Sequence, residues 1–572
     1  LNVAVGSQAL RVQNAGANAY NVGIGYNAGG AITTGVQNTL IGGLAGNALT
    51  DADRNIAIGY QALTTDDLGS RTIALGTGAV FSQNYATATN SHNIGIGDLS
   101  LFYNVTGVNN TFVGSAAGLG ASGNSHSNNT GIGYAAGTAI TTGSQNTLIG
   151  ARAGDAINTG GNNVAVGWAT LSADTKGDKT VALGRSALGS QNFTTATDTY
   201  NVAVGYLAGG AVTTGTLNTL VGGLAGDALT TGDSNIAIGY VSLSSDTKGE
   251  RAVAVGEGAL FTQNFTSETN NYNTAVGYNA GYAVTTGVQN TLIGGIAGDS
   301  ITTGSYNIAI GTNGGGGVTT GSQNILIGQG TGMAALTGDL NTVVGDSAGA
   351  ALTSGATNTL IGALAGDSIT TGNRNAVIGH NVATSLQDGS DNVAIGDSVD
   401  VAASLGNSIT IGSGISATGS NDFSFGKASN IVTNDFDADA NWSRSSDQRL
   451  KKNITDQTLG LSFINDLRTV KYNWKANHEL DSSDSQLAHL YKEDPEDNEM
   501  NTEATMHNFI AQEVKTALDA AGVSDFGGWK EDQYGVQQVS REMFVIPLVK
   551  AVQELSAQVT ALQAEVNTLK GG

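Results

Sequence analysis

The chain contains no cysteine and only 2 prolines among its 572 residues, and charged residues make up just 12 % of it. A globular domain usually carries about 25 % charged residues. The absence of cysteine excludes disulfide bonds and thiolate metal sites. Aromatic residues are also scarce, at 6 %. No apolar run approaches the roughly 18 residues of a membrane-spanning helix, so we expect no membrane insertion.

Basic residues are too few for a nucleic-acid partner. The net charge is -23, whereas nucleic acids and anionic membranes attract basic surfaces. The six histidines lack the spacing of metal ligands, and we expect neither a metal site nor a cofactor; they are His92, His126, His380, His478, His489 and His507. The chain begins with Leu1 and has no signal peptide, so we expect a fragment or a processed product.

Glycine is abundant, with 83 residues, and apolar residues make up 40 % of the chain. Disorder would require low hydrophobicity, so this composition favours a repetitive β structure. The repeating unit is Asn-x-x-aliphatic-Gly, as in Asn38–Gly42, Asn55–Gly59 and Asn358–Gly362. It occurs 25 times, from the copy that ends at Gly6 to the copy that ends at Gly426, most often 17 residues apart. This periodicity predicts a parallel β-solenoid over residues 1–427, with one short strand in each coil.

The repeat also predicts how side chains stack along the solenoid. The fourth position is apolar in every copy, for example Ile41, Ile58 and Val221, and we expect it to form an aliphatic ladder inside. Twenty copies begin with Asn, which predicts a ladder of hydrogen-bonded amides. Ala-Gly pairs such as Ala45-Gly46 fit a second, tightly packed wall. At about 4.8 Å per coil, the coils would stack to roughly 120 Å.

This pattern resembles the parallel β-roll heads of trimeric autotransporter adhesins, which also occur in phage fibres. The likeness covers about residues 1–427, and it implies a homotrimer. The coils of those heads are more often shorter. The first coil starts at Asn2 with nothing to cap it. An open end of this kind invites edge pairing, so we expect further sequence before Leu1.

Three coils are 21 residues long and end at Gly97, Gly205 and Gly277. Each adds a polar loop with one aromatic residue, namely Tyr85, Phe193 or Phe265. Extra residues in a solenoid coil usually bulge from one face, often the binding face. These three residues are therefore candidate receptor contacts. The alternative is that each ring packs back on the shaft or enters a subunit interface.

Composition changes after Lys427, where Gly becomes rarer and 13 of the 24 basic residues follow. We expect a polar linker over residues 428–445 and a separate domain over 446–572. Its sequence markers are Ser446-Asp-Gln-Arg-Leu-Lys451, then Leu467-Arg-Thr-Val-Lys-Tyr-Asn-Trp474, then Phe509-Ile-Ala-Gln-Glu-Val514 and Leu548–Leu555. Their succession resembles the intramolecular chaperone and peptidase domain that ends endosialidases, tailspikes and phage tail fibres.

That family implies a small α+β chaperone that trimerises and then cuts itself off at the serine of its Ser-Asp-x-Arg motif. Here the scissile bond would be Ser445–Ser446. Ser446 would attack the Ser445 carbonyl to give an ester that water opens, and Lys451 would be the general base. On an α-helix these two side chains would lie about 140° apart, so the hypothesis needs a turn or a lysine from a neighbouring subunit. The alternative is that both residues are structural.

The chain ends in a heptad pattern. Apolar residues alternate at spacings of three and four from Val545 to Leu569, which predicts a coiled coil over 545–570. Valine and leucine in alternate seam positions favour dimers in isolated peptides, but both resemblances imply trimers, and we expect a trimer. The alternative is an ordinary amphipathic helix that packs on a core.

Together these features predict a homotrimeric fibre of a virion tail or a cell surface, with a host receptor or glycan as its partner. Its only expected chemistry is one self-cleavage by a Ser-Lys dyad. Two alternatives stay open. One is a bacterial surface fibre that retains its chaperone, and the other is a fragment of a polysaccharide depolymerase whose catalytic part lies upstream.

Overall fold

The computed structural model describes residues 1–16, 18–428, 430–435, 443–444, 446–498, 500 and 502–571. The chain divides into two compact units, residues 1–445 and 446–572. Among the described residues, no helix combines the length and apolarity that a bilayer crossing requires. The same residues contain no cluster of three or more His, Asp or Glu side chains placed to hold a metal ion.

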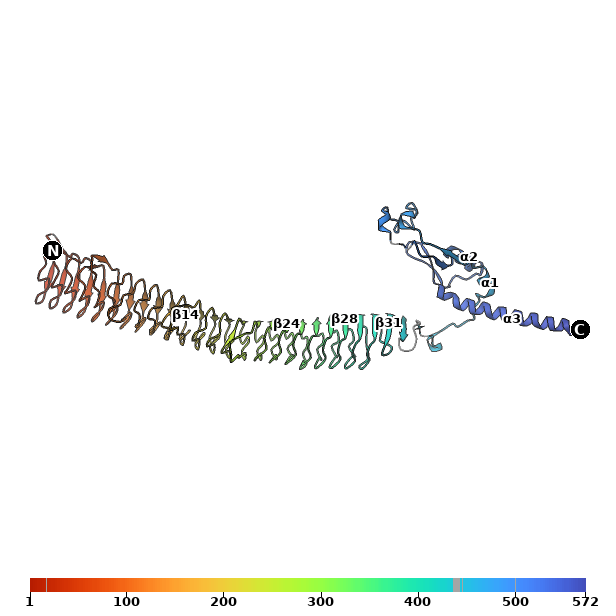
Figure 1. Cartoon of the computed structure of the whole chain (residues 1–572), viewed down its shortest axis with the longest axis horizontal. Coiled ribbons are helices and arrows are strands. Elements are labelled where there is room, and N and C mark those ends of the chain that lie inside the picture. Colours follow the sequence, from red (N-terminus) through yellow and green to blue (C-terminus); the bar gives the residue numbers. More distant parts are fainter. Residues whose placement is uncertain are drawn as a thin grey trace. The chain divides into compact units, whose positions relative to one another are not determined.

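The first unit is a single row of stacked coils, which Figure 1 shows from red to green. Each repeat contributes one strand, and 25 of these strands pair in parallel in chain order. The register is constant, so that Thr219, Ile236 and Val253 lie side by side. The predicted parallel solenoid with coils of about 17 residues is therefore confirmed.

The strands of this sheet are β1 (Val3–Val5), β2 (Val22–Ile24), β3 (Thr39–Ile41), β4 (Ile56–Ile58), β6 (Ile73–Leu75), β8 (Ile94–Ile96), β9 (Thr111–Val113), β10 (Thr130–Ile132), β11 (Thr147–Ile149), β12 (Val164–Val166), β14 (Val181–Leu183), β16 (Val202–Val204), β17 (Thr219–Val221), β18 (Ile236–Ile238), β20 (Val253–Val255), β22 (Thr274–Val276), β23 (Thr291–Ile293), β24 (Ile308–Ile310), β25 (Ile325–Ile327), β26 (Thr342–Val344), β27 (Thr359–Ile361), β28 (Ala376–His380), β29 (Val393–Asp397), β30 (Ile409–Ser413), β31 (Asp422–Lys427), β32 (Asn430–Asp435) and β33 (Ser443–Arg444).

The C-terminal end of the solenoid is closed by antiparallel strands. β32 pairs antiparallel with β31 along its whole length, and β33 pairs antiparallel with β32. The segment 428–445, predicted as a linker, is therefore partly sheet. The correction has a physical reason: the last parallel strand presents free backbone groups at its edge, and a returning strand satisfies them. The polar composition of the segment gave no sign of this pairing.

The side of each strand that faces the interior differs from our expectation. The third position of the motif is buried, as at Leu40, Ala57 and Leu220. The fourth position faces outward, and Ile58 is 36 % exposed. Successive residues of a strand point to opposite faces of the sheet. If the third residue faces the interior, the second and the fourth must therefore face outward. The fourth position is aliphatic, but it does not form the core.

The glycine that ends each motif allows neighbouring coils to approach closely. Gly42 has a φ of 133°, and a Cβ there would lie 2.4 Å from the carbonyl oxygen of Gly59. Any side chain would therefore push the two coils apart. The narrow interior is filled by the third-position residues together with aliphatic side chains from the rest of the coil, such as Leu49 and Leu229.

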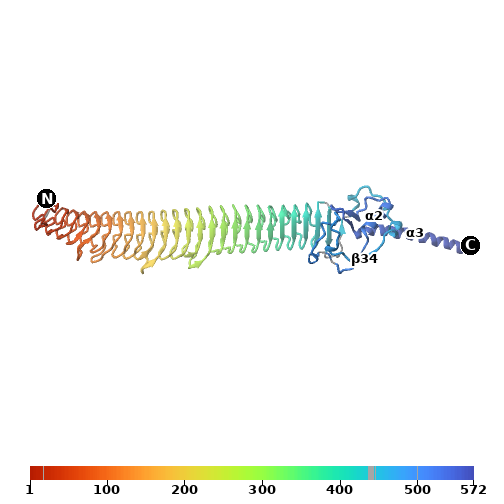
Figure 2. The same cartoon turned by 90° about the horizontal axis from the view of Figure 1, so that it is seen from above.

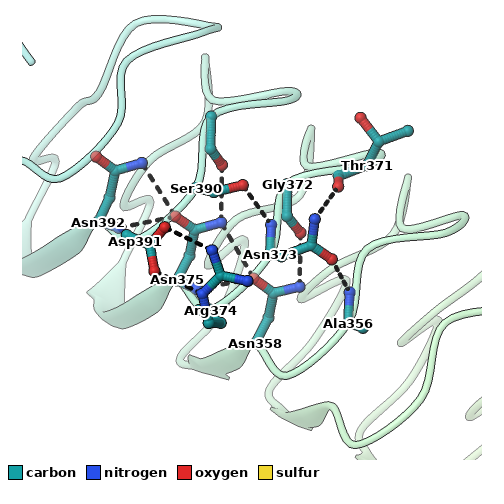
Figure 3. Close-up of polar contacts among 11 residues, drawn as sticks. Ala356, Asn358, Thr371, Gly372, Asn373, Arg374, Asn375, Ser390, Asp391 and Asn392 are labelled. Atoms are coloured by element: carbon teal, nitrogen blue, oxygen red, sulfur yellow. Dashed lines mark hydrogen bonds and ion pairs between the residues drawn. The ribbon is translucent and has the colours of Figure 1, made fainter.

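The predicted asparagine ladder is present and buried, and Figure 3 shows part of it. The Asn375 Oδ1 accepts the backbone N–H of Asn392 at 3.1 Å, and the Asn375 Nδ2 donates to the Gly389 carbonyl at 2.9 Å. Asn375 is bound in the same way to Asn358, at 3.0 Å. Each amide thus joins one coil to the next and also binds the turn 14 residues later in the sequence, directly before the next motif.

The three long coils bury their aromatic residues. Tyr85 is 5 % exposed, and Phe193 and Phe265 are 6 % exposed. The Tyr85 hydroxyl also donates to the Gly107 carbonyl at 2.6 Å. The rings are therefore buried in the shaft and are not presented to a receptor. Figure 2 shows the loops of the second and third long coils projecting from the row in its yellow part.

In these coils, glutamine restores the interrupted ladder. The ladder position is Thr72, Thr180 or Ala252 instead of Asn. In the third coil, Gln263 Oε1 accepts from Asn273 Nδ2 at 2.8 Å, and Gln263 Nε2 donates to Asp246 at 2.6 Å. Gln83 with Asp66, and Gln191 with Asp174, repeat this arrangement.

Each long coil also contains a second short parallel pair. These pairs are β5 (Gly69–Ser70) with β7 (Thr89–Asn90), β13 (Gly177–Asp178) with β15 (Thr197–Asp198), and β19 (Gly249–Glu250) with β21 (Thr269–Asn270). They fasten the end of each inserted loop to the preceding coil.

The second unit is a small α+β fold. Its helices are η1 (Gln448–Leu450), α1 (Leu461–Asn465), η2 (Asn477–Glu479), η3 (Pro495–Asp497), α2 (Ala511–Ala520), η4 (Arg541–Phe544) and α3 (Val545–Lys570). Its antiparallel pairs are β34 (Val470–Tyr472) with β35 (Met506–Asn508), and β36 (Trp529–Glu531) with β37 (Gln537–Val539). Phe463, Val514, Leu518 and Phe544 form its core.

A ladder mutation tests the role of the buried amides. We expect Asn375→Ala to lower the local stability of the shaft by about 2–4 kcal/mol, because it removes several buried hydrogen bonds and leaves their partners unpaired. Hydrogen exchange of the coils around residues 358–392 would measure the change. Thr371→Ala, an exposed neighbour, is the control. Equal exchange in the two variants would contradict a stabilising ladder.

The buried carboxyls of the long coils predict a pH dependence. Burial raises the pKa of Asp66, Asp174 and Asp246 above its ordinary value. The folded shaft therefore holds these protons more tightly than the unfolded chain does. Their contribution to stability is largest below the unfolded pKa of about 3.9 and falls as the pH rises through the raised values.

Denaturation midpoints across pH would show this effect as a difference between wild type and the triple variant Asp66→Asn, Asp174→Asn, Asp246→Asn. The wild type should lose stability relative to the variant as the pH rises. Parallel pH profiles would contradict the prediction.

Candidate functional site

Ser446 and Lys451 lie at the start of the second unit and are in contact. The Lys451 Nζ donates to the Ser446 Oγ at 2.6 Å. Residues 448–450 between them form the single 3-10 turn η1, and Lys451 is extended, with φ −113° and ψ 146°. The tight turn followed by an extended residue brings the lysine back over the serine. The turn that the dyad hypothesis required is thus present within one chain.

Asp447 and Arg449 hold the turn in shape. Asp447 is the N-cap of η1, and its Oδ1 accepts the Arg449 backbone N–H at 2.9 Å. The Arg449 guanidinium also donates to both carboxylate oxygens. These hydrogen bonds hold the pKa of Asp447 below its ordinary value, and those from the Arg449 side chain have the largest effect. The Asp and Arg of the Ser-Asp-x-Arg motif therefore fix the backbone between the two candidate catalytic residues.

The site is open in the single chain, since Ser446, Lys451 and the residues between them are exposed. Ser445, on the other side of the candidate scissile bond, lies outside the described residues. A serine and a lysine at this distance can exchange a proton, and a neutral lysine would make Ser446 a nucleophile.

One ion pair and one hydrogen bond join the sequence markers into one fold. The Arg468 guanidinium binds the Glu513 carboxylate at 2.5 Å, which links the segment of β34 to the first turn of α2. The Glu554 carboxylate accepts the Leu461 backbone N–H at 2.8 Å, which links α3 to the N-terminus of α1. These partners are 45 and 93 residues apart in sequence. The markers could be read from the sequence, but these pairings could not.

Residues 446–523 match the family described as "Chaperone of endosialidase". Residues 446–523 are therefore similar to a chaperone-of-endosialidase domain, and we use the name chaperone domain for the unit 446–572 that contains them. The matched range begins at Ser446, and it ends before β36 and α3, so it is shorter than the likeness we expected over 446–572. A long β-solenoid followed by this domain is the arrangement of a tail-fibre-like protein with a C-terminal chaperone. No curated protein matches the chain.

The chaperone domain also contains a cavity that the sequence did not indicate. It has a volume of about 790 Å³ and lies between β34 and the segment around β37. Leu480, Leu487, Leu490 and Met500 are among its lining residues, and they lie within or next to a segment rich in Asp and Glu that begins at Asp481. In the described part of this segment, 481–498, the acidic residues 493, 494, 496 and 497 are exposed, whereas leucines line the cavity.

The helix α3 of the chaperone domain leaves its apolar seam uncovered. Pro547 and Ala551 are buried against the domain, while every residue from Leu555 to Gly571 is exposed. The seam residues are 40–82 % exposed; they are Val545, Leu548, Val552, Leu555, Val559, Leu562, Val566 and Leu569. Helices in proteins draw most of their stability from the packing of an apolar face, and the outer part of this seam has no packing partner within the single chain. The amphipathic helix packed on a core, which was the alternative to a coiled coil, describes only its first turns.

Proposed function

We propose that this protein is a homotrimeric attachment fibre whose chaperone domain assembles three shafts and then releases itself by cutting the Ser445–Ser446 bond. One observation carries the proposal: the Ser446 Oγ lies 2.6 Å from the Lys451 Nζ, at the first residue of the chaperone domain. Cleavage there would separate the chain at the boundary between its two compact units.

The reaction needs no external reagent except water. In this step the deprotonated amine of Lys451 would take the hydroxyl proton as the Ser446 Oγ attacks the Ser445 carbonyl carbon. The peptide C–N bond breaks, the nitrogen receives the proton, and an ester joins the Ser445 acyl group to the Ser446 oxygen. Water then hydrolyses the ester. The products are a shaft that ends in a Ser445 carboxylate and a chaperone that begins with a free Ser446 amine.

Trimerisation is supported by the uncovered seam of α3. Three such helices would bury the apolar seam in a coiled coil, with Val and Leu in alternate positions. The family to which residues 446–523 match also implies trimeric fibre assembly. The globular part of the domain would then decide the number of chains, because the dimer preference of isolated peptides is small against a large interface.

A repetitive shaft needs such a guide. Its coils look alike, so that chains can pair in many wrong registers. A trimer formed first at the C-terminus raises the effective concentration of the shafts and sets their register. Loss of the guide would then make assembly hard to reverse. The localisation that follows is a virion tail or another extracellular surface.

Attachment to a host receptor or glycan is assigned to the loops of the long coils. The buried rings cannot provide it, but residues 86–88, 194–196 and 266–268 are exposed. These short segments contain Thr and Ala, with one Ser and one Glu. They project where extra residues of a solenoid most often bind partners.

The dyad can be tested by intact mass. Wild type should give two fragments, 1–445 and 446–572, whereas Ser446→Ala and Lys451→Met should stay at 57.6 kDa, because each lacks one partner of the proton transfer. Lys452→Met, which removes a neighbouring cation, is the matched control and should cut. Hydroxylamine should also speed cleavage of the wild type, since it attacks an ester. An uncut wild type would contradict self-release.

The seam can be tested by refolding the uncut Ser446→Ala chain. We expect Leu562→Asp to reduce the yield of trimers severalfold, because three carboxylates would meet in the coiled coil. Leu562 is 59 % exposed in the single chain, so the change costs the monomer little. Gln563→Asp, on the next residue, should refold like its parent. Light scattering would measure the yield, and a monomeric parent would contradict the trimer.

A further inference from the structure

The shaft carries an exposed apolar stripe along one face. It consists of the second and fourth residues of the 25 motifs, which point outward from the sheet. Ile236 and Ile238 of β18 are typical, and each is 38 % exposed. Each of these side chains is covered on two sides by the equivalent residues of the adjacent strands, as Ile236 is by Thr219 and Val253. The exposed part is therefore the outer side of the side chain. We call this face the outer stripe.

The outer stripe contains no charged residue. All 25 fourth positions are Val, Ile, Leu or Phe, and 15 of the 25 second positions are Val, Ile or Phe. The other ten are Thr or Ala. Monomeric proteins rarely leave large contiguous apolar patches in water. The chain has a net charge of -23, yet none of its charged residues lies in this stripe. An uncharged apolar surface of this kind is typical of a protein interface.

The size of the outer stripe fits a stable protein interface. Its length is about 120 Å for 25 strands and its width about 10 Å for three residues, which gives about 1,200 Å². A standard interface takes roughly 800 Å² from each partner. A second copy of this chain has an apolar face of the same length and period, and in parallel register every coil would meet its own equivalent.

The charges beside the outer stripe indicate the orientation of the copies. The residues directly before the first residue of each motif form one flank, and its charged members are Arg54, Arg71, Lys179, Arg251, Arg374 and Asp391. The residues directly after each motif glycine form the other flank, and its charged members are Asp98, Arg185, Glu257, Asp346, Asp397 and Lys427. One flank is mainly basic and the other mainly acidic. Parallel copies bring unlike flanks together, whereas antiparallel copies bring like flanks together.

We infer that the outer stripe is the surface through which the shafts of three parallel copies pack against one another. The inference rests on the proposed trimer and names the face that the shaft contributes to it. The buried asparagine ladder then holds coils together within a chain, and the outer stripe holds chains together. The remaining walls of the coil and the loops of the long coils stay available to other partners.

Cross-linking of single cysteines tests this inference in the uncut Ser446→Ala chain, which otherwise contains no cysteine. Thr359→Cys and Ile361→Cys place a thiol at the second or fourth position of β27. Ser354→Cys places one in an exposed turn of the same coil, outside the strand. Leu555→Cys, on the seam of α3, reports the trimer independently of the shaft.

With a short bis-maleimide, we expect the variants at 359, 361 and 555 to give cross-linked pairs of chains on denaturing gels, and the variant at 354 to stay a single chain. Cross-linking at 555 without cross-linking at 359 or 361 would overturn the inference and leave the proposed trimer intact. Equal cross-linking at 354 would also overturn it. A monomer by light scattering with no cross-link at any position would overturn the trimer as well.

Discussion

Each coil of the shaft is bound to the next by the same hydrogen bonds at the same positions, and the buried asparagine column enforces that register. The Asn375 side chain accepts from the following coil and donates to a turn 14 residues later in the sequence. A buried amide that lost these partners would stay unsatisfied, which costs more than the bonds themselves contribute. Strand, turn and stacking distance are therefore linked, and the glycine that ends each motif follows from the same close approach.

In the long coils, the column of buried amide hydrogen bonds continues although the asparagine is missing. Where a loop is inserted, the ladder residue is lost, and a glutamine from the loop reaches back to the next asparagine. Its amide nitrogen is held by a buried aspartate whose pKa is raised by desolvation. The aromatic side chain of each loop, which the sequence predicted as a receptor contact, is buried. In the first long coil, the Tyr85 hydroxyl also accepts from the Asn93 amide at 3.3 Å. An insertion that presents an exposed loop thus needs an internal polar bridge of its own.

A column of asparagines that repeats in most coils stabilises a shaft but does not distinguish one such coil from another. The contacts of the chaperone domain are not repetitive, because they join segments far apart in the sequence, such as Arg468 with Glu513. Its α3 seam and the outer stripe of the shaft are both apolar and uncovered in one chain. On the proposed function, the first would start assembly and the second would extend it, and cleavage at Ser446 would end the dependence of the fibre on its guide.

Local spacing was enough to predict the number and period of the coils, the asparagine ladder and the extent of α3. Which side of each strand faces inward depends on the tertiary structure. Both sides are mostly apolar, so alternation alone could not choose, and the narrow interior takes the third-position residue, most often Ala or Leu. The tertiary structure also decided the antiparallel closure by β32, the burial of Tyr85 and the approach of Lys451 to Ser446. Each of these depends on backbone turns and on partners that are not neighbours in the chain.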